Sequence, residues 1–433
     1  MRFLGIGEYC SLGDMYYRLG HAGHEVKVYI ADPEAQDIFG GMVQLTPHWS
    51  DELEWITAAG KDGIILFESA VNGWLQDQLR SNGYQVIGGS AFGDRLESER
   101  DFGQAVLREL GLQTARSHRY TDFSAAMEFI RATPARYVFK INGADSMRAR
   151  NYVGQMDDGS DMLALLELQQ AQWREAGNPD FVLMEFIEGI EVGVGAYFNG
   201  ESFLQPACLD WEHKKLFPGD LGELTDEMGT VVTYRGAERI FDLTLARMRE
   251  QLRASGYCGY INLNLIANEQ GIWPLEFTSR FGYPGFAICE TLHMESWDSI
   301  FRKMLERNTL ELSTRSGFAT GVVLTVPPYP YAHGYAELSK GTPIAFRGSL
   351  TAEEHRDLHF AEVAVQRSQL VTSGMTGYVG VATGAGDSVA AACDKAYALA
   401  HKVVVPNLRY RLDIGERVMR RGLSGLRALG YLD

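Results

Sequence analysis

Hydrophobic and polar positions follow two alternating periods over the first 90 residues. Short apolar runs predict buried strands, and the segments between them carry apolar residues at helical spacing. Strands that alternate with helices in this way are typical of a parallel, doubly wound sheet. The expected strands are 2–7, 25–30, 63–67 and 85–88, and the expected helices are 11–22 and 72–82.

Three glycines follow the first of these strands. Gly5, Gly7 and Gly13 hint at an anion-binding loop, but the third comes too late for the dinucleotide-binding fingerprint. Isolated glycines also serve tight turns between a strand and a helix, and such matches are weakly specific. We therefore favour a tight turn over a nicotinamide site, which disfavours a dehydrogenase.

From residue 91 to residue 316 the pattern is that of an α+β segment. Asn199-Gly200 predicts a two-residue hairpin between two strands. Residues 211–234 are polar but contain Trp, His, Phe and Met, which favours a functional loop over disorder. The expected helices are 97–110, 123–132, 160–175, 238–254 and 297–307, and the expected strands are 117–120, 137–141, 181–187, 191–199 and 201–209.

A second predicted hairpin carries the most unusual side chains. Asn262 and Asn264 share one face of its first strand, and Glu276, Thr278 and Arg280 share one face of its second. This face suits either of two roles, the solvated side of a surface hairpin or the floor of a Mg-nucleotide site. The second role is chemically reasonable because Mg²⁺ takes carboxylate and phosphate oxygens, and an arginine can hold a phosphoryl group.

The last region begins near residue 317 and reads as a further α+β unit that ends in a basic tail. Its expected strands are 321–326, 358–366 and 378–382, its expected helix is 388–404, and the tail is 409–417.

Composition narrows the class of partner. The 433 residues carry a formal net charge of −16 and a pI near 5.1, which disfavours nucleic acid and anionic membranes, since both need a basic surface. No apolar run approaches the ~20 residues of a membrane span. The five cysteines are scattered and odd in number, so a disulfide framework or a zinc site is not expected and a reducing cytoplasm fits.

Three polar features follow one another on apolar strands. Lys140 lies mid-strand, where a lysine is rarely buried unless it is paired, although a lysine that reaches the surface fits as well. Residues 184–191 form an apolar strand end with acids beside it, which suits either an adenine-binding hinge or an ordinary hairpin. Glu276, with Thr278 and Arg280, comes last.

This order resembles the ATP-grasp superfamily of carboxylate–amine ligases, and within it the phosphoribosylamine–glycine ligase family. The resemblance covers nearly the whole chain, including Leu275-Glu-Phe-Thr-Ser-Arg-Phe-Gly282 and the C-terminal Tyr410-Arg-Leu-Asp-Ile-Gly415. It implies an ATP-grasp fold, α/β and α+β. The implied parts are a doubly wound pre-ATP-grasp lobe at 1–90, an ATP-grasp domain at 91–316 with a lid at about 113–195, and an α+β C-terminal domain at 317–433.

The resemblance implies roles for residues that bind the nucleotide. It places the ATP phosphates on basic side chains, adenine at a strand end, and the ribose beside an acid. The residues are Arg100, Lys140, Arg148 and Arg150 for the phosphates, Glu185, Phe186 and Ile187 for adenine, and Glu191 for the ribose.

The resemblance also implies a metal site and a catalytic group. Mg²⁺ or Mn²⁺ would bind mainly to Glu276. Arg280 would hold the transferring phosphoryl or acyl-phosphate group. The further metal ligands would be Asn264 and Thr278, and His213 and Lys214 match a His-Lys pair in the loop over the active site.

Four stretches differ from the family pattern. The phosphate lid at 142–151 holds one glycine, and Gly7-Glu-Tyr-Cys10 replaces the Gly-Gly-Arg-Glu-His segment that handles the sugar phosphate. The loop that the family enriches in Asn, Thr and Gly reads Gly222-Glu-Leu-Thr-Asp-Glu-Met-Gly229. Tyr283 stands where the family has Asp. The residues expected to bind the nucleotide therefore match the family pattern better than those expected to bind the other substrates.

We expect an ATP- and Mg²⁺-dependent ligase that forms an amide through an acyl phosphate and has a changed acid or amine substrate. Its expected partners are small molecules, with no nucleic acid and no membrane, in a cytoplasmic monomer or homodimer. Two alternatives stay open: phosphoribosylamine–glycine ligase proper, and a non-catalytic nucleotide-binding protein.

Overall fold

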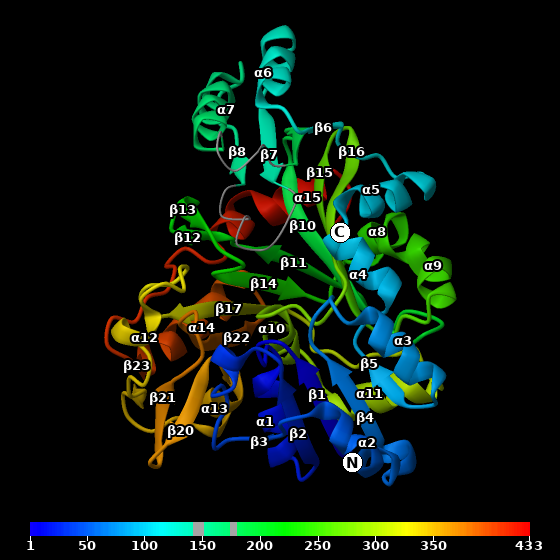
Figure 1. Ribbon diagram of the computed structural model, residues 1–433, viewed down its shortest axis with the longest axis vertical. Coiled ribbons are helices and arrows are strands. Elements are labelled where there is room, and N and C mark those ends of the chain that lie inside the picture. The colour runs from blue at the N-terminus through cyan, green and yellow to red at the C-terminus, as the bar shows by residue number, and fades with distance from the viewer. Residues whose placement is uncertain (142–150, 174–179) are drawn as a thin grey trace.

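The computed structural model describes residues 1–141, 151–173 and 180–433 of the chain. At the bottom of Figure 1, the N-terminal lobe holds a five-stranded parallel sheet in the order β3-β2-β1-β4-β5. The order reverses at β1, so the predicted parallel, doubly wound lobe is confirmed. Its elements are β1 (Arg2–Gly7), α1 (Gly13–His21), β2 (Glu25–Ile30), β3 (Gln44–Leu45), α2 (Leu53–Thr57), β4 (Gly63–Phe67), α3 (Gly73–Ser81) and β5 (Gln85–Ile87).

Two of the glycines in and after β1 serve close packing. A Cβ atom on Gly5 would overlap the Tyr16 ring, and one on Gly7 would overlap the Glu68 carboxylate. Packing therefore accounts for these two glycines, which lie within β1 itself.

An eight-stranded antiparallel sheet crosses the middle of the molecule (Figure 1). Its order is β16-β15-β10-β11-β14-β17-β22-β19. Because β14 pairs with β17, the segments before and after residue 317 contribute to one continuous sheet. The strands are β10 (Ile190–Phe198), β11 (Cys208–Glu212), β14 (Gly229–Thr233), β15 (Gly259–Asn268), β16 (Gly271–Thr278), β17 (Phe318–Thr325), β19 (Leu358–Phe360) and β22 (Tyr378–Gly386).

A smaller unit projects at the top of Figure 1, where α6 and α7 lie beside a four-stranded sheet of order β6-β9-β7-β8. It has its own aromatic core, in which the Phe123 and Phe181 rings stack with centroids 4.8 Å apart. This unit lies within the residues expected to form a lid. Its elements are β6 (Ser117–Tyr120), α6 (Phe123–Ala132), β7 (Tyr137–Ile141), β8 (Tyr152–Val153), α7 (Ser160–Gln172) and β9 (Phe181–Glu185).

Two helices expected to be continuous are broken. The helix predicted at 97–110 is instead α4 (Ala91–Ser98) and α5 (Arg100–Glu109), separated by Glu99 in a non-helical conformation. The helix predicted at 238–254 is α8 (Glu238–Leu243), a 3₁₀ turn and α9 (Arg249–Ala254). Thr244 causes the second break, because its hydroxyl bonds back to the Ile240 carbonyl at 2.6 Å and its backbone leaves the helix.

The hairpin predicted at Asn199-Gly200 is wrong in its second strand. The Asn199 side chain accepts the backbone N–H groups of Glu201 and Ser202, which makes a tight turn with a single bridge between Phe198 and Phe203. Pro206 has no N–H to continue the ladder, and pairing resumes only at β11.

The segment expected to be a long loop at 211–234 also contains regular structure. It holds the end of β11, a small hairpin of β12 (Lys215–Phe217) and β13 (Leu221–Leu224), and β14. The interpretation as a structureless loop is therefore wrong, because much of the segment pairs in strands, including Glu212 and Glu223.

The C-terminal region packs α14 (Val389–Lys402) against β17 and β22. The strand predicted at 358–366 is two strands, because the buried Glu362 carboxylate turns the chain by accepting the N–H groups of Thr376 and Gly377 at 2.8 Å. The remaining elements are α10 (Gly285–Glu290), α11 (Trp297–Glu306), α12 (Tyr335–Leu338), β18 (Ala345–Phe346), α13 (Ala352–Asp357), β20 (Val363–Gln366), β21 (Gln369–Thr372), β23 (Val403–Val404) and α15 (Leu423–Ala428).

The C-terminal tail fastens the β12–β13 hairpin to the body. Arg411, only 2% exposed, donates to Asp413 at 2.5 Å, to Asp220 at 2.8 Å and to the Lys215 carbonyl at 3.0 Å. Asp413 in turn accepts the Gly219 N–H at 2.9 Å.

All five cysteines are buried free thiols, so the expectation of no disulfide framework is confirmed. Within the described parts of the chain, every helix is too short or too polar to cross a membrane.

Candidate active site

The β15–β16 hairpin forms one edge of the central sheet and sets the geometry of the site. Its register places Asn264 opposite Glu276 and Asn262 opposite Thr278, so the predicted shared polar face is confirmed. A bulge follows Asn264, and the extra residue, Leu275, turns its carbonyl to the Gln104 side chain of α5 at 2.9 Å. The bulge locally bends the strand that carries Glu276.

Glu276 is surrounded by cations from three separate parts of the chain. Its Oε2 atom lies 3.4 Å from Arg100 Nη2 of α5 and 3.7 Å from Lys140 Nζ of β7. Its Oε1 atom lies 3.2 Å from Lys214 Nζ, just after β11. Lys140, then Lys214 and Arg100, hold the pKa of the Glu276 carboxyl far below its usual range despite the opposing effect of burial.

Lys140 is a paired lysine rather than one that reaches the surface. Burial lowers its pKa to about 8, and the positive charges of Arg100 and Lys214 act in the same direction, while Glu276 opposes them. Since Lys140 lies beside two other cations, this part of the site attracts negative charge beyond the single carboxylate that is present.

Glu212 joins this group, although the sequence interpretation missed it. Its Oε2 atom lies 2.9 Å from Lys214 Nζ and accepts the Asn264 side-chain amide at 3.1 Å. The alternation Asp210-Trp-Glu212, with acids two residues apart, is the pattern that could have identified a polar strand face here.

The expected adenine hinge lies at the end of β9. The backbone N–H of Glu185 bonds to the Arg116 carbonyl at 2.9 Å, and that of Phe186 bonds to the Arg136 carbonyl at 3.1 Å. The Arg136 guanidinium lies 3.5 Å from the centre of the Phe186 ring. Ile187 packs against the small apolar cluster that includes Met184 and Val182.

Glu191, the expected ribose ligand, is an exposed residue at the start of β10. Its negative charge raises the pKa values of both Lys140 and Lys214, so it lies on the same side of the sheet as the Glu276 group.

Arg280 and His213 contact other groups than Glu276. Arg280 Nε donates to Glu97 of α4 at 3.0 Å, and Glu97 also accepts the Ser279 N–H at 2.8 Å. Glu97 therefore orients Arg280, a role that sequence reasoning did not assign. His213 is 1% exposed and its Nε2 accepts the Gly415 N–H at 3.3 Å; burial, with nearby Arg417 and Arg411, lowers its pKa to about 4.

Thr278 ends β16 opposite Asn262, two positions from Glu276 on the same face. Arg148 and Arg150 lie outside the described residues.

The donor set fits a divalent cation with a polyphosphate. Glu276, the Asn264 amide oxygen and the Thr278 hydroxyl are hard oxygen ligands on one face of the β15–β16 hairpin, of the kind that Mg²⁺ takes together with phosphates and water. Lys140, Lys214 and Arg100 supply three positive charges at the same place. The arrangement thus suits the nucleotide that the sequence resemblance implies.

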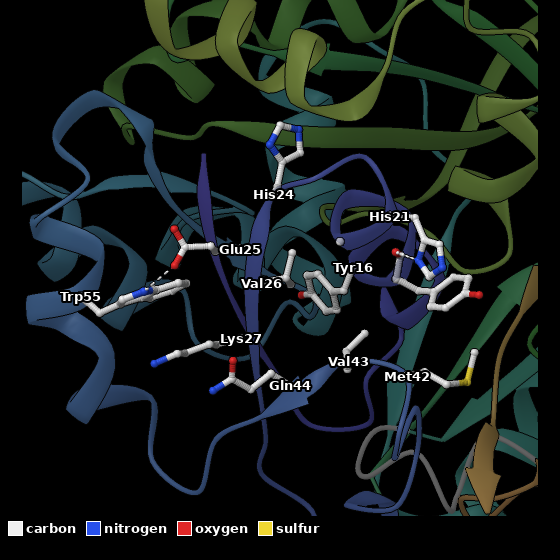
Figure 2. A pocket seen from close by; sticks show the side chains of 12 residues that line it. Tyr16, His21, His24, Glu25, Val26, Lys27, Met42, Val43, Gln44 and Trp55 are labelled. Carbon is white, nitrogen blue, oxygen red and sulfur yellow. Dashed lines mark hydrogen bonds between the residues drawn. The ribbon is translucent and has the colours of Figure 1, made fainter. Parts of the chain in front are cut away.

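A hollow of about 440 Å³ on the N-terminal lobe lies elsewhere (Figure 2). It lies between α1, β2 and β3, where Trp55 donates to Glu25 at 3.4 Å and lies beside Lys27. Among the described residues, the expected site side chains do not line it.

Comparison with known proteins agrees with this geometry. Residues 98–286 match the family described as "Phosphoribosylglycinamide synthetase, ATP-grasp (A) domain". The phosphoribosylamine–glycine ligase of Neisseria meningitidis serogroup B is 25% identical over 422 residues, covering 93% of this chain and 92% of that protein. The enzyme of the same name from Pseudomonas syringae pv. tomato is 28% identical over 362 residues, or 80% of each chain.

The fold is similar as well. The crystal structure of phosphoribosylamine–glycine ligase from Thermotoga maritima superposes with a TM-score of 0.70 at 25% identity, covering 96% of this chain and all of that one. Residues 98–286 therefore form an ATP-grasp domain, and the whole chain has the fold of phosphoribosylamine–glycine ligase, to which it is distantly related.

Proposed function

We propose that the protein joins a carboxylic acid to an amine, with conversion of ATP to ADP and phosphate. The observation that carries this proposal is the convergence of Lys140, Lys214 and Arg100 on Glu276, beside the Asn264 amide. A group of three cations around one acid suits the binding of a charged polyphosphate and the stabilisation of its transfer.

In the first step, an oxygen of the substrate carboxylate attacks the γ-phosphorus of ATP. The bond from that phosphorus to the bridging oxygen breaks, which gives an acyl phosphate and ADP. The amine nitrogen then attacks the acyl carbon, the carbon–oxygen bond to phosphate breaks, and the nitrogen loses a proton to solvent. Positioning and charge stabilisation supply the catalysis, with no covalent attachment to the chain.

Each side chain has a role in this scheme. Lys140 and Arg100 bind phosphate oxygens, and Lys214 holds the oxygens near Glu276 in place. Arg280, oriented by Glu97, stabilises the charge on the transferred group. Mg²⁺ would be held by Glu276 with Asn264 and Thr278, and when bound it would neutralise phosphate charge.

Substrate-dependent ADP release tests the proposal. We expect Glu276→Ala and Lys140→Ala each to lower the rate by about 100-fold or more, because preorganised charges of this kind are worth roughly that much. Glu250→Ala is a matched control, since this acid is 66% exposed and pairs with Arg253 at 2.7 Å in a surface contact. Normal turnover by both site variants would refute the assignment.

Phosphoribosylamine–glycine ligase proper is the second candidate, because the similarity to that enzyme extends over 93% of the chain. Complementation of a purine auxotroph that lacks this ligase separates the two candidates. We expect no growth, since the substrate half differs at Tyr283 and along 222–229.

A further inference from the structure

A second group of acids lies on the same sheet face as Glu276, further along β11 and β14. Asp210 of β11 and Glu227, just before β14, are each 6% exposed. Burial is the main cause that raises the pKa of Glu227, and the carboxylates of Glu212 and Asp210 add to it. Burial and the Glu212 carboxylate also raise the pKa of Asp210. The two carboxyl groups are therefore close enough to repel each other.

Glycines on the neighbouring strand make room for these side chains. Gly193 of β10 lies opposite Asp210, and a Cβ atom there would overlap the Asp210 carboxylate. Gly195, the next residue on this face, would in the same way meet the Tyr260 hydroxyl and approach the Asn262 amide. The backbone of β10 thus allows several polar groups to lie over one strand.

Several buried oxygens here lack a hydrogen-bond partner among the residues that the structure describes. They are Asp210 Oδ1, Glu227 Oε1 and Asn262 Oδ1. Asn262 is 5% exposed and is held by its own amide nitrogen, which donates to Asp210 Oδ2 at 2.6 Å, so its oxygen stays available as an acceptor. Buried acceptors without a donor are costly, and a donor-rich ligand would satisfy them.

Tyrosine rings lie next to the acids. Tyr283 packs edge-on against Tyr378 with ring centres 5.3 Å apart, and Tyr329 lies 4.8 Å from Tyr378 and donates to its hydroxyl at 2.9 Å. Met228, the residue after Glu227, packs with Tyr329 and Tyr378 in one apolar cluster. Burial is the main cause that raises the pKa of Tyr283, followed by the charges of Glu362 and Asp14, and Glu227 adds a smaller effect. Aromatic faces beside carboxylates are a favourable environment for an organic cation.

Two of the stretches that differ from the family pattern contribute residues to this group of acids and tyrosines. The loop 222–229 brings Glu227, and the motif after Arg280 brings Tyr283. These residues are 56 positions apart in the chain, yet Met228, beside Glu227, packs with Tyr378, whose ring centre lies 5.3 Å from that of Tyr283. Changes at two distant positions that converge on one cluster indicate a change in what is bound there.

We propose that Asp210, Asn262 and Glu227, with the Tyr283 ring, form a subsite for an aliphatic ammonium group of the substrate, at a position distinct from the group that reacts. This inference rests on the proposed ligase function and specifies its substrate class. An ammonium group brings three N–H donors and a positive charge, which match the acceptors without partners and the uncompensated acids.

The negative charge of the subsite favours an ammonium over a phosphate. A phosphate would be repelled by Asp210 and Glu227. The subsite therefore disfavours a sugar phosphate as the second substrate.

Matched probe pairs that differ by one ammonium group test the proposal with the full chain. We would measure binding by calorimetry in the presence of Mg²⁺ and a non-hydrolysable ATP analogue. The amine pair is 1,4-diaminobutane against butylamine, and the acid pair is β-alanine against propionate. The amine pair reports an ammonium on the acceptor, and the acid pair reports one on the activated acid.

We expect the ammonium-bearing member of at least one pair to bind about tenfold more tightly than its partner. Glu227→Gln should abolish that preference, and Tyr283→Leu should reduce it about threefold. Asp226→Asn removes the same charge from an exposed neighbour of Glu227 and should leave the preference within twofold.

Nucleotide binding serves as the independent readout of folding and of the ligase site. If all variants bind the nucleotide but neither pair shows a preference, or Glu227→Gln leaves the preference intact, the ammonium subsite is refuted and the ligase function stands. Competition by ribose 5-phosphate for these probes would also refute it. If the wild-type protein binds no nucleotide, the ligase proposal itself fails.

Discussion

Two groups of carboxylates on the central sheet differ in the charge that surrounds them. Glu276 has three basic partners, Lys140, Lys214 and Arg100, within 3.7 Å. The second group, Asp210 and Glu227, has two carboxyls whose pKa values rise through burial and the charge of Glu212, and Lys214 is the cation that moderates both. The first group carries excess positive charge and the second carries excess negative charge.

This difference indicates what each group binds. A site with more cations than acids is suited to a polyphosphate, which brings negative charge of its own. A site with two buried acids and oxygens that lack donors is suited to a cation. Lys214 stands between them, because it contacts Glu276 at 3.2 Å and Glu212 at 2.9 Å.

Among the substitutions that test this difference in charge, replacement of Lys214 should have the largest effect. Lys214→Met keeps the apolar stem and leaves Glu276 and Glu212 without this cation. We expect ADP release to fall about 100-fold. The free energy of unfolding should fall by about 2 kcal/mol, less than the 3–5 kcal/mol typical of fully buried pairs, because Glu276 is 38% exposed. Urea denaturation and the ADP assay measure the two effects.

Lys215→Met is the matched control for this prediction. Lys215 is the next residue and its ammonium contacts only the Gly222 carbonyl, at 3.0 Å, on the surface. We expect changes of about 0.5 kcal/mol or less and near-normal turnover. Equal losses of ADP release and stability in both variants would show that the charge difference between the two groups does not depend on Lys214.

The nucleotide group was largely predictable because strand alternation places its residues. Glu276 and Thr278 lie two apart on an apolar strand, and the alternating pattern gave the bounds of β7 correctly around Lys140. Lys214 was assigned through the family resemblance. The pairing of Asn264 with Glu276 follows from the hairpin register, which a short turn largely determines.

The second group was not predictable from local patterns. Glu212 was expected in a polar loop and Asp210 at its edge, since acids in a polar segment are usually solvated. Asp210 is buried because β11 pairs with β10, where Gly193 leaves the space that the Asp210 side chain occupies. The pairing of Gly193 with Asp210 joins two different strands, so no short stretch of sequence predicts it. Glu97, which orients Arg280, escaped notice for the same reason.

Neutralising one acid from each group should change stability in opposite directions. Glu276→Gln leaves three cations without their carboxylate and should lower the free energy of unfolding by about 1–2 kcal/mol. Glu227→Gln removes a buried, uncompensated acid and should raise it by about 1 kcal/mol at pH 7 in the absence of substrate. Urea denaturation of both variants measures the two signs, and a loss of stability in both would remove the distinction between the groups.

The smallest expected effect is a difference in pH dependence. The folded-state pKa of Glu227 is raised above its unfolded value, so between these two values the folded protein binds more protons than the unfolded chain. Stability from this group is therefore fully present below the unfolded pKa, near 4.3, and is lost as pH rises. The slope from one proton cannot exceed about 1.4 kcal/mol per pH unit. Denaturation of the wild type and Glu227→Gln from pH 4.5 to 8 should show curves that separate progressively toward high pH, with the variant the more stable. Parallel curves would mean that Glu227 already has an internal cation as partner, and the contrast with Glu276 would no longer hold.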